Sequence, residues 1–344
     1  MKTGNKFGTH RVIEPQGVLP QPAEKIDNTM EIYDNEILLE VETLNIDSAS
    51  FTQLEEEADG DLEQISNKIQ KIVGDRGKMH NPVTGSGGML IGQVKEIGPE
   101  LADRDLQVGD RLATLVSLSL TPLQIEEITE IRPEVDQVDI KGQAILFASG
   151  IYAKLPEDMS DTLALAVLDV AGAAAQTAHL VDPGDRVLII GAGGKSGLLC
   201  LHEAQKRAGV TGQVIGMGHS DRSTQRIVET GLADEVLQAD ATEPLTVYEK
   251  VSEVTEAEMA DVVINCVNIP DTEMASILSC QDGGKIYFFS MATSFTGAAL
   301  GAEGVGKDVE MIIGNGYTRG HDLISLEILR ENKTLRDIFT KIYG

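Results

Sequence analysis

A short apolar run that leads into a glycine-dense turn constrains the fold of this chain more than any other feature. Residues 187–190 are Val-Leu-Ile-Ile, and residues 191–199 are Gly-Ala-Gly-Gly-Lys-Ser-Gly-Leu-Leu. This order is typical of a buried parallel strand that enters a helix through a turn with few side chains. Glycines let backbone N–H groups approach a phosphate, and a helix N-terminus adds about half a positive charge. The stretch therefore predicts an anion-binding strand–turn–helix unit.

The glycines of this turn fit two spacings. In the G-x-G-x-x-G pattern, Ser196 replaces the third glycine, whereas G-x-x-G-x-x-G fits at Gly191, Gly194 and Gly197. A P-loop also ends in Gly-Lys-Ser, but it requires a glycine five residues before Gly194, where Ile189 stands. The P-loop interpretation fails. A dinucleotide turn remains, with a tight strand–helix turn without ligand as the alternative.

The sequence after this turn alternates between short apolar runs and helical patterns. Strands are predicted at 213–217, 235–238, 261–267 and 285–289, with a sixth at 309–313. The intervening helices end near Gly209 and Gly231, as C-terminal glycines favour. An alanine-rich helix over residues 160–180 precedes the turn, with Ser160 as its N-cap. We therefore expect an α/β fold, with a doubly wound parallel sheet, a Rossmann domain, over residues 156–344.

The first half of the chain has a different pattern. Strand-like runs at 36–43, 89–94 and 108–115 predict a β-rich domain over residues 1–155. An acidic helical insertion interrupts it near 52–78, where Leu62, Ile65, Ile69 and Ile72 share one face. The stripe predicts packing against the domain, and a lid or a partner-facing helix is the alternative.

Charge and composition exclude several kinds of partner. With 28 Lys+Arg against 55 Asp+Glu, the net charge of −27 repels nucleic acid and anionic membranes. No apolar run approaches the ~18 residues of a membrane span, and residues 1–6 lack a signal peptide's apolar core. Cys200, Cys266 and Cys280 suit reduced thiols. We expect a cytoplasmic protein without nucleic-acid or membrane partners.

The order of these landmarks over residues 36–330 resembles the medium-chain dehydrogenase/reductase superfamily. The segments that carry the resemblance are Val-Gly-Asp-Arg at 108–111, residues 152–156, Asp-Pro-Gly-Asp-Arg-Val at 182–187, Asn-Cys-Val at 265–267 and Gly-Gly-Lys at 283–285. The resemblance implies a GroES-like first domain, a nicotinamide cofactor, and a homodimer through the edge strand near 309–313.

The zinc sites of that superfamily are missing. No cysteine precedes Cys200, so the cysteine-containing ligand sets of both zinc sites cannot form. Asn-Ile-Asp-Ser at 45–48 stands where the catalytic cysteine is expected, and Thr-Gly-Ser-Gly-Gly at 84–88 replaces the usual Gly-His-Glu segment. The chain also stops at Gly344 without the usual return into the first domain. We therefore expect no metal.

Within the superfamily, three segments are similar to the diaminohexanoate dehydrogenase family of anaerobic lysine fermentation. They are residues 80–89 (His-Asn-Pro-Val-Thr-Gly-Ser-Gly-Gly-Met), the turn at 191–197, and residues 313–317 (Ile-Gly-Asn-Gly-Tyr). This resemblance implies oxidative deamination of 3,5-diaminohexanoate to 5-amino-3-oxohexanoate and ammonia. Two alternatives stay open: a zinc-free NADPH-dependent quinone or enone reductase, and a nucleotide-binding protein without catalysis.

Without zinc, side chains must move the protons of such a reaction. The candidates are Asp47, His80, Thr84 and Ser86, on loops that the resemblance places facing the cofactor domain. The alternatives are a turn aspartate that caps N–H groups, a surface histidine, and two residues that only shape the loop. Glu310 is the candidate partner of the substrate's second ammonium group, with a solvated glutamate at a strand edge as the alternative.

The predicted cofactor contacts lie in the turn and at the ends of the later strands. They are Gly191, Gly193, Gly194, Lys195, Ser196, Gly197, His219, Ser220, Arg222, Cys266, Val267, Asn268, Ser290 and Met291. NAD-specific folds place an acid at the tip of the second strand, where this chain has Gly218. Ser220 and Arg222 suit a 2′-phosphate, whereas Asp221 can reach a hydroxyl, so the cofactor is predicted as NAD or NADP.

Overall fold

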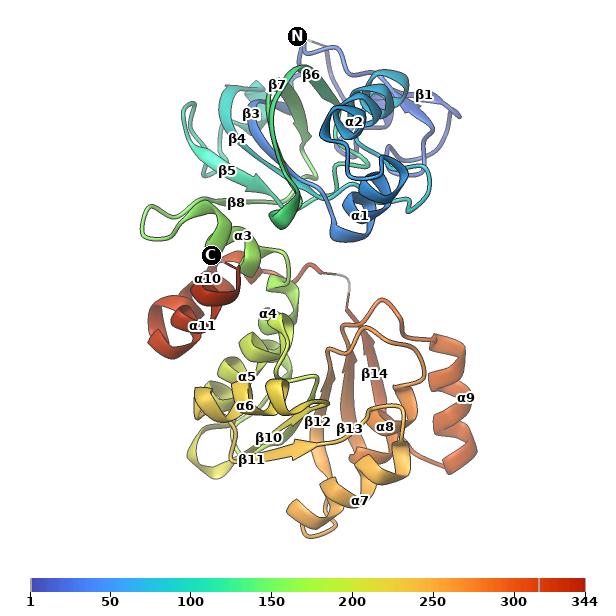
Figure 1. Ribbon diagram of the computed structural model, residues 1–344, viewed down its shortest axis with the longest axis vertical. Helices are drawn as coiled ribbons and strands as arrows, with labels where there is room; N and C mark the ends of the chain where they lie inside the picture. The colour runs from blue at the N-terminus through green and yellow to red at the C-terminus, as the bar shows by residue number, and fades with distance from the viewer. Residues whose placement is uncertain (1, 315, 344) are drawn as a thin grey trace. The chain divides into compact units, whose positions relative to one another are not determined.

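The computed structural model describes residues 2–314 and 316–343 (Figure 1). The chain forms two compact units, Met1–Glu157 and Asp158–Gly344, and each has its own six-stranded sheet.

The sheet of the N-terminal unit is antiparallel, with the order β6-β7-β3-β4-β5-β8. Its strands are β3 (Glu36–Asn45), β4 (Met89–Ile97), β5 (Arg111–Thr114), β6 (Leu123–Arg132), β7 (Gln137–Phe147) and β8 (Tyr152–Lys154). Ile37, Leu39 and Val41 alternate along β3 and bury their side chains in one core. The predicted β-rich architecture is confirmed.

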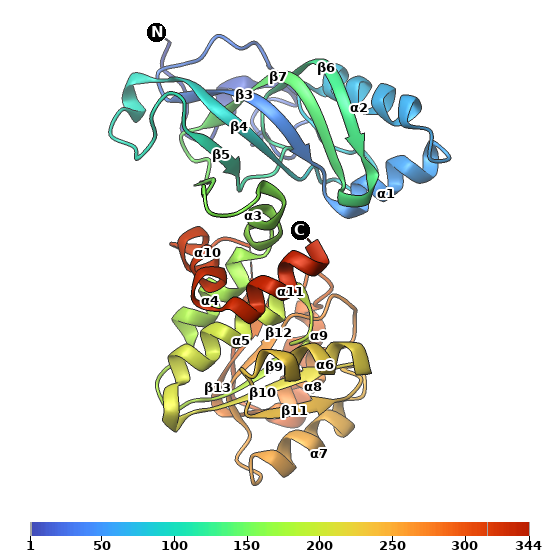
Figure 2. The same cartoon turned by 60° about the vertical axis from the view of Figure 1, so that its left-hand side comes forward.

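The acidic insertion forms two helices, α1 (Ser48–Glu57) and α2 (Leu62–Arg76). Asp59 and Gly60 separate them with positive φ angles of 50° and 74°. Ile65 and Ile69 are fully buried in the core of the unit, and Figure 2 shows α2 beside β6. The stripe therefore packs against the domain, although Leu62 is 45% exposed and does not take part.

Residues 2–35 are attached to the sheet through a buried ion pair. The strands β1 (Val12–Glu14) and β2 (Lys25–Ile26) pair with each other. The fully buried guanidinium of Arg11 donates to both carboxylate oxygens of Glu36, from Nε and Nη2, each at 2.6 Å. Burial alone would raise the pKa of Glu36, but hydrogen bonds from Arg11 and His10 outweigh it and lower that pKa to about 2.

The sheet of the C-terminal unit is parallel, with the order β11-β10-β9-β12-β13-β14. Its elements are β9 (Arg186–Ile190), α5 (Lys195–Ala208), β10 (Gln213–Gly218), α6 (Asp221–Thr230), β11 (Glu235–Gln238), α7 (Pro244–Val254), β12 (Ala260–Asn265), α8 (Glu273–Ser279), β13 (Cys280–Phe288), α9 (Phe295–Val305) and β14 (Glu310–Ile313). Gly209 and Gly231 follow α5 and α6 as their C-terminal caps. The predicted doubly wound sheet is confirmed.

The single helix predicted over residues 160–180 is wrong. Two helices, α3 (Asp161–Leu168) and α4 (Ala171–Leu180), meet at a bend of 50°. Val170 has left the helical region with a φ of −121°, and the carboxylate of Asp169 is paired with Lys195 of α5. Ser160 caps α3 as predicted, because its Oγ accepts from the N–H of Leu163.

The C-terminal helices α10 (His321–Glu331) and α11 (Lys333–Tyr343) pack against α3. Among the described residues, no single helix has both the length and the apolar character needed to cross a membrane, and only the bent pair α3–α4 has both when taken together.

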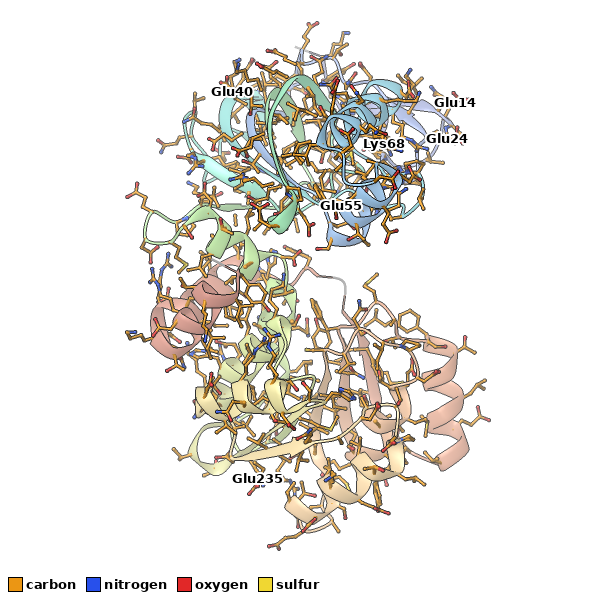
Figure 3. The ribbon with its side chains drawn as sticks, in the orientation of Figure 1. Glu14, Glu24, Glu40, Glu55, Lys68 and Glu235 are labelled. Atoms are coloured by element: carbon orange, nitrogen blue, oxygen red, sulfur yellow. The ribbon has the colours of Figure 1, made fainter. Side chains whose placement is uncertain are left out.

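Charged side chains project from both units, among them the exposed Glu14, Glu24 and Glu235 (Figure 3).

Candidate functional site

The predicted cofactor contacts meet at the carboxyl edge of the parallel sheet. The strand order reverses between β9 and β12, and sheets of this kind bind ligands beyond the strand ends at that point. The turn after β9 is tied to its neighbours, because the N–H groups of Gly191 and Ala192 donate to the Met217 carbonyl, and Cys266 N–H donates to the Ile190 carbonyl, all at 2.9 Å. The loops after β9, β10 and β12 therefore share one edge.

Three glycines of the turn are required by its geometry. Gly191 has a φ of +82°. A Cβ at position 197 would lie 2.3 Å from the Gly191 oxygen, and one at position 193 would lie 2.3 Å from the Ser223 oxygen. A Cβ at position 194 would meet nothing closer than 3.4 Å. The required spacing is G-x-G-x-x-x-G, which neither predicted spacing describes.

The N-terminus of α5 suits a phosphate group. Its N-cap, Gly194, is exposed and offers no side-chain hydrogen bond to the first turn. By contrast, Ser220 caps α6 in a reciprocal capping box with Ser223. A bound pyrophosphate would satisfy the free donors of α5. The turn therefore fits a nicotinamide dinucleotide, whereas the Ser220 hydroxyl is already engaged by its own helix.

The charged residues around this edge differ in how they are held. Lys195 Nζ lies 2.5 Å from Asp169 Oδ2 and 5.6 Å from the centre of the Tyr343 ring, so its charge is engaged by the residue that follows α3 and by α11. Arg222 is exposed and makes no ion pair among the described residues. Arg226, which the sequence did not indicate, donates to the Gly193 carbonyl at 3.3 Å.

The strand tip at Gly218 is shaped by packing. A Cβ there would lie 2.7 Å from Ser223 Oγ and 3.0 Å from the Thr224 nitrogen, because α6 begins directly over the strand. The nearby Asp221 carboxylate accepts from Gln238 Nε2 at 3.1 Å. No carboxylate therefore stands at the tip itself.

The loop after β12 is organised by a buried asparagine that is not among the predicted cofactor contacts. Asn265 accepts from Val267 N–H at 3.0 Å and donates to Thr272 Oγ1 at 2.9 Å. Cys266 turns its thiol toward α5, 3.9 Å from Cys200 Sγ, and the hydrogen bond with Cys200 together with burial raises its pKa. A polar residue at the end of an apolar strand was the available signal for Asn265.

The remaining predicted contacts lie in the loops of the same edge. Asn268 is exposed, as is Met291 at 88%, whereas Ser290 Oγ accepts from the N–H of Ala292 at 3.1 Å. His219 is exposed and lies 3.6 Å from an oxygen of Asp240. Asn315, within the segment 313–317, is outside the described residues.

Two of the four acid–base candidates of the N-terminal unit, Asp47 and Thr84, lie at the start of α1. Asp47 is the N-cap of this helix, since its Oδ1 accepts from Ser50 N–H at 3.0 Å. Its Oδ2 is buried and has no partner among the described residues. Thr84 reaches the same helix through the Ser50 hydroxyl, 2.5 Å from its own. Asp47 is therefore both a cap and a carboxylate with one free oxygen.

The loop that carries Thr84 and Ser86 is closed by Asn81. This buried side chain accepts from Val83 N–H at 2.8 Å and from Thr84 N–H at 3.3 Å. It also donates to Gln53 Oε1 of α1 at 2.8 Å. Ser86 is half-buried, and its N–H donates to Thr84 Oγ1 at 3.4 Å.

His80 is half-buried, rather than a surface histidine, and its Nδ1 has no partner in the described structure. Burial, with the charges of Lys78 and Arg76, lowers the pKa of His80 to about 4. Its imidazole is therefore neutral near pH 7 and a weak proton acceptor. Lys78 is itself buried, and its ammonium donates to the Pro20 and Gln21 carbonyls at 2.7 and 2.9 Å.

Glu310 lies apart from these groups. It is exposed at the first position of β14 and in register with Lys285, whereas Ile313 is the residue level with Phe288 at the carboxyl edge. Within one chain, the strand therefore places Glu310 at the amino end, away from the glycine turn.

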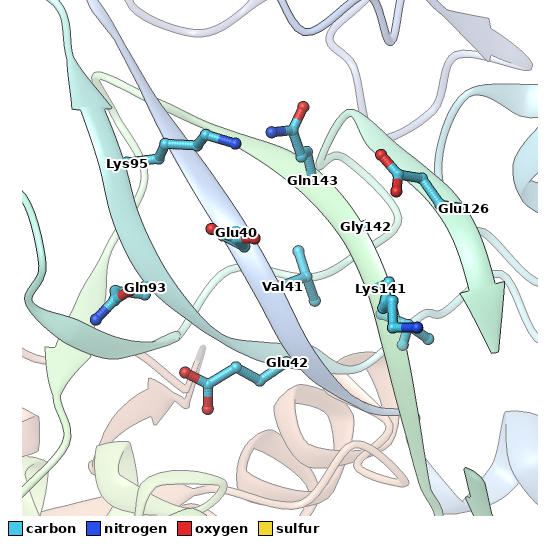
Figure 4. A pocket seen from close by; sticks show the side chains of 10 residues that line it. Glu40, Val41, Glu42, Gln93, Lys95, Glu126, Lys141, Gly142 and Gln143 are labelled. Carbon is cyan, nitrogen blue, oxygen red and sulfur yellow. The ribbon is translucent and has the colours of Figure 1, made fainter. Parts of the chain in front are cut away.

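A hollow of about 530 Å³ lies on the solvent-facing side of the antiparallel sheet (Figure 4). It contains none of the predicted site residues. Its lining consists of Glu40, Val41, Glu42, Gln93, Lys95, Glu126, Ile140, Lys141, Gly142 and Gln143. Because its charged side chains are largely exposed to solvent, we propose no catalytic or binding role for this hollow.

One group in the described part of the chain has metal-ligand spacing: His202, Glu203 and Glu331. Cations already neutralise both carboxylates, since Arg207 lies 3.1 Å from Glu203 and Lys206 lies 2.7 Å from Glu331. These ion pairs disfavour a metal ion there.

Known proteins with similar sequences point to one enzyme family. Residues 10–156 match the family described as L-erythro-3,5-diaminohexanoate dehydrogenase N-terminal domain. The chain is 62% identical over 341 residues to the L-erythro-3,5-diaminohexanoate dehydrogenase of Acetoanaerobium sticklandii, with 99% of each chain covered. It is 60% identical over 344 residues to the enzyme of the same name from Fusobacterium nucleatum, with 100% of each covered.

The fold is shared with a solved structure at much lower sequence identity. A mycobacterial protein in complex with NADPH superposes with a TM-score of 0.56 and 18% identity, over 93% of this chain and 86% of that one. This likeness supports the two-sheet architecture described above.

Proposed function

The chain belongs to the L-erythro-3,5-diaminohexanoate dehydrogenase family, and on that basis we propose that it oxidises the C3 amine of a 3,5-diamino acid. The products are 5-amino-3-oxohexanoate, ammonia and a reduced nicotinamide, as one step of lysine fermentation. The observation that carries the proposal is the full-length identity of 60–62% to two enzymes of that name.

In this proposal the C-terminal unit holds NAD or NADP, which accepts the hydride when bound. The glycine turn and the uncapped N-terminus of α5 bind the pyrophosphate. The loops after β10, β12 and β13 contact the rest of the dinucleotide, and Asn265 fixes the second of these loops.

The N-terminal unit supplies the acid–base groups. Asp47 is the proposed proton acceptor, because its Oδ2 is a buried carboxylate oxygen without a partner in the described chain. His80 is neutral near pH 7, and its proposed role is to form a hydrogen bond rather than to act as a base. Thr84 and Ser86 bind the substrate, and Glu310 retains its proposed role toward the second ammonium only in an assembly that brings another chain's β14 nearby.

The reaction in the reverse direction tests this function. We expect oxidation of NADH or NADPH with 5-amino-3-oxohexanoate only when ammonia is present, because the amine nitrogen must come from ammonia. Absorbance at the reduced-nicotinamide band measures it. Ammonia-independent oxidation by a quinone would instead favour the reductase alternative, and cofactor binding without any turnover would favour a nucleotide-binding protein.

The choice between NAD and NADP depends on Arg222, the exposed guanidinium after the carboxylate-free tip of β10. We expect Arg222→Ala to lower kcat/KM with NADP about tenfold and with NAD less than about twofold, because a charge-assisted hydrogen bond to the 2′-phosphate is lost. Steady-state kinetics with both cofactors measures this. Lys95→Ala, on the outer face of the other sheet, is the control. An equal loss with both cofactors would contradict the assignment.

We further propose that the protein is a homodimer that pairs through β14. In the described part of the chain this strand pairs with β13 alone, and Ile313 and Leu300 are exposed at 58% and 62%. An exposed strand edge beside apolar side chains favours pairing with a second copy. Native mass spectrometry distinguishes the dimer from a monomer.

The three cysteines form no disulfide, and they support a reducing compartment, the cytoplasm.

A further inference from the structure

Within the described residues, the Ser50 hydroxyl has one hydrogen-bond partner, and this fixes the direction of the bond. Ser50 is fully buried at the third position of α1. Within the described chain, Thr84 Oγ1, at 2.5 Å, is the oxygen that its hydroxyl contacts. A buried donor without an acceptor is costly. The Ser50 proton therefore points to Thr84, and Thr84 is the acceptor of this pair.

Thr84 Oγ1 is then saturated as an acceptor. It receives the Ser50 hydroxyl at 2.5 Å and the Ser86 N–H at 3.4 Å, which together use its two lone pairs. Its own proton has no acceptor among the described residues, and Thr84 is exposed. Acceptance of two hydrogen bonds also polarises the remaining O–H bond. Thr84 is consequently a directed donor toward solvent or a ligand.

The backbone N–H groups of residues 83–86, around Thr84, are already in use. The N–H groups of Val83 and Thr84 donate to Asn81 Oδ1, and Gly85 N–H donates to the Asn81 carbonyl at 2.9 Å. A ligand that approaches Thr84 therefore meets its hydroxyl donor rather than these backbone N–H groups.

We propose that Ser50 and Asn81 are positioning residues that hold Thr84 as a hydrogen-bond donor to the carboxylate of the substrate. The inference rests on the proposed function and deepens it. A 3,5-diamino acid offers two ammonium groups, which only donate, and one carboxylate, which only accepts. Thr84 can therefore bind the carboxylate and neither ammonium group.

A double-mutant cycle tests this inference. We expect Thr84→Val to raise KM for 3,5-diaminohexanoate about tenfold to 100-fold with little change in kcat, since a hydrogen bond to a charged group is lost. Ser50→Ala should raise KM about tenfold. The double variant should equal Thr84→Val alone, because Ser50 acts only through Thr84. Thr84→Ser should restore KM to within about threefold of the original.

Ser48→Ala is the matched control. Ser48 opens the same helix, but its hydroxyl bonds Asp136 rather than the loop, so KM should not change. Thermal unfolding of each variant separates a folding defect from a binding defect. Independent effects of Ser50→Ala and Thr84→Val, or a loss in kcat with KM unchanged, would overturn the inference.

If the proposed function is wrong, a binding measurement still tests the inference about Ser50 and Thr84. If the unmodified protein turns over no amine, calorimetric titration of its NADH complex with 3,5-diaminohexanoate decides the inference. Weaker binding by Ser50→Ala would then support the positioning role, and no binding by the unmodified protein would overturn it together with the proposed function.

Discussion

Gly197→Ala is expected to weaken the binding of NADH and NADPH at least about 100-fold. A Cβ at this position would lie 2.3 Å from the Gly191 oxygen and 2.6 Å from the Ala192 Cα, both backbone atoms of the turn. Neither atom can withdraw without moving the end of β9 away from α5. Overpacking of this kind costs about 1–3 kcal/mol, and the donors that face the phosphates would be displaced. Fluorescence titration with each reduced cofactor measures the loss.

Gly194→Ala, three residues earlier in the same turn, is the control. Its Cβ would meet no atom closer than 3.4 Å, so the turn keeps its shape. We expect at most about a tenfold loss of affinity, the change that ~1.4 kcal/mol produces, and an unchanged thermal midpoint. Equal losses in the two variants would show that crowding within the turn does not explain its glycines.

The parallel sheet could be predicted because its signal is local. A strand buried on both faces needs an unbroken apolar run, and Val187, Leu188, Ile189 and Ile190 are all fully buried. The glycine spacing was not predictable in the same way. Gly193 is required by the Ser223 carbonyl, which lies thirty residues further along the chain and comes into contact only when α6 packs on the turn.

The error in the length of the helix over residues 160–180 has a physical origin. Periodicity describes which residues share a face, but it does not show where a helix is interrupted. The break after α3 depends on Asp169, whose partner Lys195 belongs to another helix. The break between α1 and α2 had a local signal in Asp59-Gly60, a pair with the positive φ angles that helices exclude.

The sequence indicated which loops carry the acid–base candidates, but not which of their side chains lie close together. Asp47 and Thr84 stand on polar, glycine-rich segments, which the sequence displays directly. Ser50 lies on a helix, and its contact with Thr84 spans 34 residues, so no spacing rule reveals it. Asn81 did have a signal, because an Asn-Pro pair favours a turn. The perturbed pKa of His80 depends on burial, which composition does not report.

The buried pair of Arg11 and Glu36 is expected to contribute most to the stability of the N-terminal unit. Glu36→Gln leaves the Arg11 guanidinium buried without its counter-charge, which costs about 3–5 kcal/mol of unfolding free energy. For a unit of this size the thermal midpoint should fall by roughly 10 °C. Circular dichroism follows the unfolding, and hydrogen exchange over residues 36–45 assigns the loss to β3.

The exposed pair of Arg111 and Glu42 provides the control, because its geometry is also bidentate while both side chains are about 40% exposed. Solvent screens such a pair, so Glu42→Gln should cost less than about 1 kcal/mol. The contribution of Glu36 to stability also depends on pH. The folded pKa of Glu36 is lowered from 4.5 to about 2, so its contribution is complete above pH 4.5 and disappears as the pH falls toward 2. The stability difference between the unmodified protein and Glu36→Gln should therefore be constant near neutral pH and shrink below pH 4.5. A difference that persisted unchanged to pH 2 would mean that the ionised carboxylate is not what stabilises this unit.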